Sequence, residues 1–233
     1  MRSITTTKCT AHGQSELTLA FDPERVLERD VRWFAGSLEQ DVESGRRFQV
    51  GQSMQTGWMW TWFTALPDGT YGFEEPDMKS ATPLVRQAGL TNTLAHLRLQ
   101  KDTLESVLSA EALSFPSIPQ TCLVCTRLEN GGAFFLDRRE PTEKDSGWIF
   151  GCESDHDHQT AASWQKTWLY TAVVGNCGRA LPYLAFPPGS LITVGADSSP
   201  VFYLHDKRLP IRKDSYLHQV MERSKRGATW DVQ

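Results

Sequence analysis

The densest group of side chains that could do chemistry lies between residues 145 and 158. An apolar run, Trp148-Ile149-Phe150, is typical of a short strand and leads into a loop rich in carboxylates and imidazoles. The carboxylates are Glu153, Asp155 and Asp157, and the imidazoles are His156 and His158. Such side chains can bind a transition metal, act as general acid and base, or recognise another protein. Their spacing alone leaves these three roles open.

A metal centre in this loop would require adjacent side chains to converge on one point, which only a tight loop allows. We therefore expect a charged recognition loop, with no metal and no cofactor. Cys122-x-x-Cys125 matches half of a zinc site, but residues three apart on a strand point to opposite faces. No second pair follows at the spacing of a zinc finger, so we interpret both cysteines as structural.

Composition narrows the class of protein. The net charge is −4, and the chain has no long basic stripe with interleaved aromatic residues, which argues against direct binding of nucleic acid. We find no signal-peptide pattern and no run of 18 apolar residues, so we expect a cytoplasmic protein that does not bind membranes. The five cysteines are odd in number and irregularly spaced, which favours reduced thiols. The Gly-x-Ser-x-Gly and Walker motifs are missing, and we expect no enzyme.

The first half of the chain predicts a helix followed by a hairpin. After Asp22-Pro23, a typical helix start, apolar residues recur at steps of three and four from Leu27 to Val42, and Gly45 ends the pattern. The run 57–63 then alternates like a strand and turns at Pro67-Asp68-Gly69. A return strand completes the expected hairpin.

Three tryptophans, Trp58, Trp60 and Trp62, share one face of that strand. We expect this face in the core, because aromatic side chains are usually buried. A second helix is expected from about Thr91. His96 lies near its apolar stripe without a partner at ligand spacing, and we interpret it as a satisfied, half-buried side chain.

The segment Phe115–Gln120 contains two prolines and suits neither a helix nor a strand. We place a domain boundary there, with an N-terminal domain at 1–116 and a C-terminal domain at 117–233. The predicted fold class is α+β, in which each small domain is a mainly antiparallel sheet with one or more packed helices.

The second half predicts several further elements. An Asn130-Gly131 turn between the apolar runs 121–126 and 133–136 predicts a hairpin. We expect a short helix that contains Trp164 and Trp168. Further expected elements are a helical turn at 181–186, strands at 191–194 and 201–204, and a final amphipathic helix at 216–225.

Several short motifs lie between Cys122 and Leu209. They are Asp145-Ser146-Gly147-Trp148, Phe150-Gly151 and Glu153, followed by Leu181-Pro182-Tyr183-Leu184 and Pro187-Pro188-Gly189. With these motifs the C-terminal half resembles a bacterial immunity-protein family, first catalogued as a domain of unknown function and later called immunity family thirty-three. The N-terminal half resembles the companion region of such proteins through Gly57-Trp58-Met59, Glu74-Glu75-Pro76-Asp77 and Thr91-x-x-Leu94.

The resemblance implies an immunity protein that binds and neutralises a cognate secreted toxin. Members that serve type VI secretion imply a nuclease effector with a basic surface, which an acidic loop could occupy. The expected contacts are Glu153, Asp155 and Asp157, with Glu74, Glu75 and Asp77 as a second acidic group and Trp148 as a supporting aromatic if exposed. Family members often continue the acidic loop with an aromatic residue, where this chain has His156-Asp157-His158.

Two other functions stay open at this point. One is a metal-dependent hydrolase that uses His156 and His158 with the neighbouring carboxylates. The other is a scaffold module with a peptide groove between its two halves.

Overall fold

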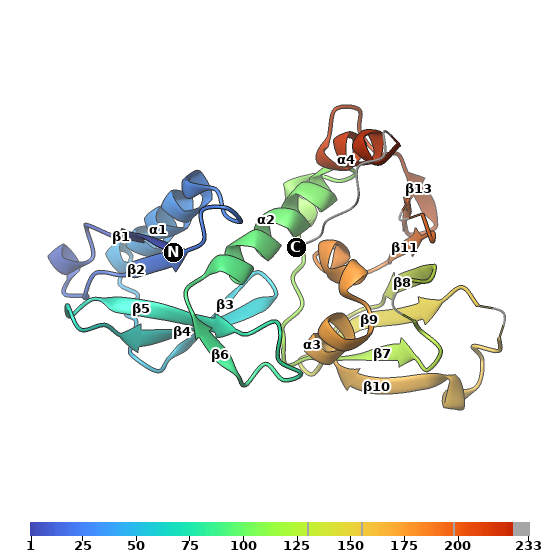
Figure 1. Ribbon diagram of the computed structural model, residues 1–233, viewed down its shortest axis with the longest axis horizontal. Helices are drawn as coiled ribbons and strands as arrows, with labels where there is room; N and C mark the ends of the chain where they lie inside the picture. Colours follow the sequence, from blue (N-terminus) through green and yellow to red (C-terminus); the bar gives the residue numbers. More distant parts are fainter. Residues whose placement is uncertain (130, 155, 198, 226–233) are drawn as a thin grey trace. The chain divides into compact units, whose positions relative to one another are not determined.

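The computed structural model of the chain describes residues 1–129, 131–154, 156–197 and 199–225. Its helices and its antiparallel and mixed sheets confirm the α+β class (Figure 1). Two compact units, residues 1–98 and 99–233, divide within helix α2 (Thr91–Glu105). The boundary at residues 116 and 117 stays a prediction.

The first unit contains two sheets and one long helix. Its elements are β1 (Arg2–Thr5), β2 (Thr18–Phe21), α1 (Glu28–Glu43), β3 (Ser53–Thr56), β4 (Met59–Ala65), β5 (Tyr71–Pro76) and β6 (Arg86–Ala88), with a 3-10 turn at Thr10–His12. Strands β1 and β2 pair with each other, and β3 to β6 form an antiparallel sheet in chain order. The apolar stripe of α1 packs in the same core as Phe63 and Phe73 of this sheet.

Helix α1 begins at Glu28, so the predicted start at Pro23 is wrong. The side chain of Asp22 accepts a hydrogen bond from the amide of Glu24 at 3.0 Å, and its carbonyl accepts one from Val26 at 3.0 Å. Residues 22–26 therefore form a turn, and Leu27 stays exposed as the residue before the helix. From Val31 onward the predicted stripe is buried.

The tryptophan face of β4 is the opposite of the one expected. Met59, Thr61 and Phe63 are the buried positions, whereas Trp60 and Trp62 lie on the other face and are half-buried. Trp58 precedes the strand and is buried, and its indole N–H donates to Nδ1 of His96 at 3.3 Å. The core prediction thus holds for Trp58 alone. His96 is satisfied as expected, although its side chain is fully buried.

The second unit contains a seven-stranded sheet in the order β10-β7-β9-β8-β11-β12-β13. The strands are β7 (Thr121–Cys125), β8 (Phe134–Arg138), β9 (Asp145–Cys152), β10 (Trp164–Trp168), β11 (Ser190–Val194), β12 (Pro200–Leu204) and β13 (Lys207–Leu209). The helical segments are Ala110–Ala112, Ala161–Ser163, α3 (Leu169–Thr171), a π turn at Ala172–Asn176, a 3-10 segment at Gly178–Tyr183 and α4 (Tyr216–Lys225). Strand β9 pairs with β7 in parallel and with β8 in the antiparallel sense (Figure 1).

The expected hairpin of β7 and β8 is wrong, because β9 lies between these two strands. Asn130 of the predicted turn lies outside the described residues. Trp164–Trp168 is strand β10 and not a helix, since it pairs with β7 along its whole length. The two strands near residues 191 and 201 and the final helix are confirmed. No helix in the described ranges is long and apolar enough to span a membrane.

Gly147 shapes the start of β9. Its φ of 75° lies in the left-handed region, and the β7–β9 register shifts beside it as in a β-bulge. A Cβ atom at this position would lie 2.2 Å from the carbonyl oxygen of Arg139. The Asp-Ser-Gly-Trp motif therefore contains a glycine that the backbone requires.

Gly147→Ala should lower the free energy of unfolding by about 2–4 kcal/mol, because strain at a left-handed residue adds to a contact with the backbone. Gly36→Ala is the matched control, since Gly36 lies inside α1 with open space around it. That control should raise stability by up to about 1 kcal/mol. Urea denaturation of both variants measures the difference, and equal stabilities would contradict the bulge.

Candidate functional site

Two cysteines meet where β7 and β9 end. Cys125 is the last residue of β7 and Cys152 the last of β9, and parallel strands end at the same edge of a sheet. Both side chains are buried, and their sulfur atoms lie 3.4 Å apart. The parallel pairing thus brings together two thiols that are 27 residues apart in the chain.

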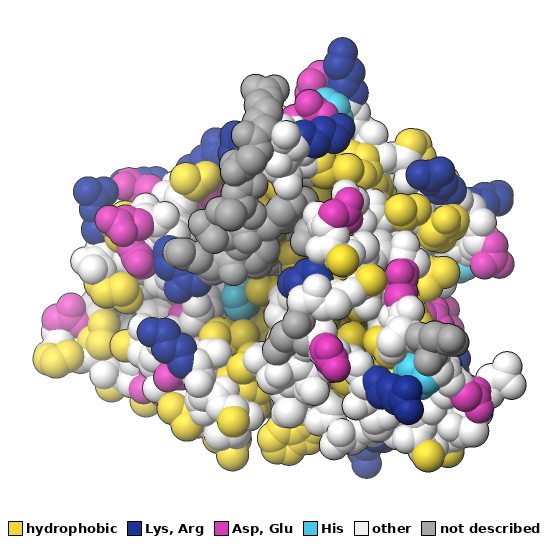
Figure 2. Space-filling model, turned by 45° about the vertical axis from the view of Figure 1, so that its right-hand side comes forward, with side chains coloured by type: hydrophobic (Ala, Val, Ile, Leu, Met, Phe, Trp, Pro, Cys, Tyr) yellow, Lys and Arg dark blue, Asp and Glu magenta, His cyan; other side chains and the backbone are white. Residues whose placement is uncertain are grey.

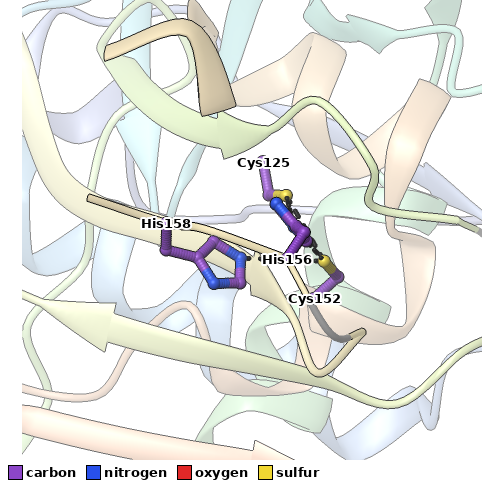
Figure 3. A group of neighbouring side chains, drawn as sticks. All are labelled: Cys125, Cys152, His156 and His158. Carbon is purple, nitrogen blue, oxygen red and sulfur yellow. Dashed lines mark hydrogen bonds between the residues drawn. The ribbon is translucent and has the colours of Figure 1, made fainter. Parts of the chain in front are cut away.

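Two histidines of the following loop return to these sulfur atoms. Nε2 of His156 lies 3.2 Å from Sγ of Cys125 and 3.0 Å from Sγ of Cys152. Nε2 of His158 lies 3.7 Å from Sγ of Cys152. Figure 3 shows both rings turned toward the sulfur atoms. One donor atom from each of the four residues lies within 4.8 Å of the others.

Aromatic packing supports the inward orientation of His158. The ring of Trp164 lies 5.3 Å from the His158 ring, and its indole N–H donates to the His158 carbonyl at 2.8 Å. The Phe135 ring contacts the His158 ring in an edge-on arrangement, with 5.8 Å between the ring centroids. A Cβ atom on Gly151 would lie 2.0 Å from the ring of Phe135. The glycine therefore leaves the space that this ring fills.

The two thiols differ electrostatically. Burial raises the pKa of the Cys125 thiol. Burial also acts to raise the pKa of Cys152, but hydrogen bonds from Ser154, Cys125 and His156 outweigh it and lower that pKa below its ordinary value. Two sulfur atoms and two imidazoles are the donor set of structural zinc sites, in which the cysteines bind as thiolates.

The predicted loop residues differ in exposure, with the described carboxylates at the surface and the histidines turned toward the sulfur atoms. Glu153 and Asp157 are exposed, and Asp155 lies outside the described residues. Sequence reasoning found the histidines but missed Cys125 and Cys152 as their neighbours. The spacing Cys152-x3-His156-x-His158 was the available signal, whereas Cys122, the expected companion of Cys125, is not part of this group.

The other predicted contact residues are largely structural. Trp148 is fully buried and donates its indole N–H to the carbonyl of Leu184 at 3.1 Å, so it is not an exposed aromatic. Glu75 is also fully buried, and its carboxylate accepts from the amides of Asn92 at 2.9 Å and Thr93 at 2.7 Å. Glu75 thus stabilises the start of α2.

Glu74 and Asp77 stay closer to the surface. Both are half-buried, and Glu74 forms a long ion pair of 3.8 Å with Arg86. The side chain of Asp77 accepts from the amide of Lys79 at 3.0 Å. The second acidic group is therefore split between one buried and two partly exposed carboxylates.

Comparisons of the chain with protein-family models, with curated proteins and with solved structures gave no match. The resemblance to immunity family thirty-three stays a prediction.

Asp145 holds the opposite end of β9. Its carboxylate accepts from the amide of Gly147 at 2.9 Å and pairs with Lys166 of β10 at 3.1 Å. Burial acts to raise the pKa of Asp145, but hydrogen bonds from Gly147, Lys166 and Thr121 outweigh it and lower the pKa. The ionised form therefore stabilises the fold above the ordinary pKa of 3.8, and this stability is lost as the pH falls through the lowered value.

Asp145→Asn should reduce the free energy of unfolding at pH 7 by up to about 1 kcal/mol, because the pair is partly exposed. The difference from the parent should shrink as the pH falls below 3.8, because the unfolded parent is protonated there and the folded parent follows as the pH falls through the lowered pKa. Urea denaturation between pH 7 and pH 3 tests this. A difference that stays constant over the range would assign the loss to packing instead of charge.

Proposed function

We propose that the protein acts by stoichiometric binding, as an immunity protein that neutralises a cognate secreted toxin in the cytoplasm of the producing cell. The observation that carries the proposal is the difference in exposure between the carboxylates and the histidines of the loop at residues 153–160. Its described carboxylates, Glu153 and Asp157, are exposed, whereas His156 and His158 turn toward buried sulfur atoms. The loop offers negative charge to a partner and keeps its imidazoles inside.

Local acidity suits a nuclease toxin, which carries a basic surface for phosphate. Figure 2 shows acidic and basic side chains interspersed over the described part of one face, without an extended patch of one sign. On this face, electrostatic attraction to a partner would come from local groups of charged side chains. Such groups speed association and select the partner more than they raise affinity.

The orientation of the histidines also favours binding over hydrolysis. A general base must reach the proton that it abstracts, through a free ring nitrogen or one water. Nε2 of both rings faces sulfur atoms at 3.0–3.7 Å. Hydrolysis with either histidine acting as general base through Nε2 is therefore the weaker candidate.

The motifs on which the proposed family rests have structural roles in the sheet. The backbone conformation at residue 147 requires a glycine, and the Trp148 indole N–H donates a hydrogen bond to the carbonyl of Leu184 in the Leu-Pro-Tyr-Leu motif. Structural roles of this kind are what an architecture shared with the proposed family would require. Toxin specificity would then depend on the exposed residues beyond Cys152.

Coexpression with the adjacent reading frame is the direct test. If that frame encodes the toxin, its toxicity should be relieved by this chain. The Glu153→Lys, Asp157→Lys double variant should weaken toxin binding by about 10-fold or more at low salt, and the loss should shrink as salt screens the charges. Isothermal titration at two ionic strengths measures both effects.

The matched control is Glu140→Lys with Glu143→Lys. These exposed residues precede β9, at the end opposite the loop, and the control changes the net charge by the same amount. It should bind the toxin like the parent. Equal losses in both double variants would assign the effect to net charge, and no loss in either would remove the loop from the interface.

A further inference from the structure

We propose that Cys125, Cys152, His156 and His158 form a closed, structural Zn²⁺ site that fixes the acidic loop to the sheet. The inference rests on the ligands alone and is independent of the toxin. It assigns a metal to a chain for which the sequence predicts none.

The distances fit a tetrahedral ion. With Zn–S bonds of about 2.3 Å and Zn–N bonds of about 2.0–2.1 Å, tetrahedral angles place two sulfurs about 3.8 Å apart and a sulfur and a nitrogen about 3.5 Å apart. The sulfur atoms lie 3.4 Å apart, and three of the four sulfur–nitrogen pairs are separated by 3.2, 3.0 and 3.7 Å. These four distances lie within about 0.5 Å of the tetrahedral values, and all four donor atoms lie within 4.8 Å of one another.

The ligands come from three places in the chain. Cys125 and Cys152 are fixed by strand pairing, and His158 packs against the rings of Trp164 and Phe135. The His156 and His158 ring centroids are 4.1 Å apart. Two imidazoles this close can direct one nitrogen each to a single ion.

Groups around the sulfur atoms complete the site. The amide of Arg127 donates to Sγ of Cys125 at 3.4 Å, and the hydroxyl of Ser154 lies 2.8 Å from Sγ of Cys152. Hydrogen bonds to ligand sulfur stabilise the thiolate form that binds a metal. Both sulfur atoms therefore have a hydrogen-bonding group beside them in addition to the imidazoles.

The donor set selects both the metal and its role. Soft sulfur with imidazole in a tetrahedral arrangement favours zinc, while calcium and magnesium prefer oxygen ligands. Four protein ligands fill the coordination sphere, so no position stays open for a catalytic water. The site would tie the loop to the ends of β7 and β9, and it would not activate a substrate.

Metal analysis of protein purified without an affinity tag tests the proposal. The parent should contain one zinc per chain, and the His156→Gln, His158→Gln variant should lose it, with affinity reduced at least about 100-fold because two ligands are missing. Cys122→Ala and His12→Gln are the controls, since both residues lie outside the group. Each control should retain zinc at the parent's level.

Titration of Co²⁺ into the metal-free parent tests the site without any substitution, so its result does not depend on whether the double-histidine variant folds. Tetrahedral cobalt with two thiolates should give strong visible bands and a thiolate-to-metal charge-transfer band, and one equivalent of Zn²⁺ should abolish both. Limited proteolysis should cut within 153–160 faster after chelation than before.

Three results would overturn the site. They are a parent without zinc whose apo form gives no tetrahedral cobalt spectrum, equal zinc in the parent and the double-histidine variant, and a Cys125–Cys152 disulfide in protein purified under reducing conditions. A protein that holds zinc but does not protect against the toxin would leave the site standing and contradict the proposed function.

Discussion

The candidate site depends on the pairing of strand β9 with a neighbour on each side. Residues 146–152 are buried throughout, so neither face of the strand is open to water. A shift of one residue would exchange the two faces of the strand and move Cys152 away from Cys125. The parallel partner β7 is decisive, because antiparallel neighbours would place the two strand ends at opposite edges of the sheet. The loop begins where it does because β9 is held in this register.

A buried cation also stabilises the part of the sheet around β9. Arg138 at the end of β8 donates to the carbonyls of Ser114, Leu184 and Phe186, and its guanidinium lies 5.2 Å from the Trp148 ring. Burial lowers the pKa of Arg138 to about 10, so the group stays charged at neutral pH. Leu184 accepts hydrogen bonds from both Arg138 and Trp148, which links the Asp-Ser-Gly-Trp motif to the Leu-Pro-Tyr-Leu motif. Their joint occurrence in the sequence has a structural cause.

What could be predicted from the sequence was local. The periodicity of α2 and α4 and the alternation in β11 and β12 are properties of short windows, and these elements were found. The Asn130-Gly131 signal is local too, but the partner of β7 is set by β9, which comes later in the chain. Alternation in β4 showed two faces without showing which one meets the core, so Trp60 and Trp62 were misplaced. The Cys125–Cys152 contact needed the parallel pairing, which no short pattern contains.

The proposed ion and the proposed interface are compatible because of charge. Two thiolates balance the charge of one Zn²⁺, and the imidazoles add none when neutral, so the ion would leave the negative charges of Glu153 and Asp157 undiminished. It would also restrict the loop before any partner arrives. Ordering a loop during binding costs free energy that a preorganised loop has already lost in folding. A closed metal site beneath an acidic loop would thus preserve electrostatic attraction to a basic partner and reduce the entropic cost of association.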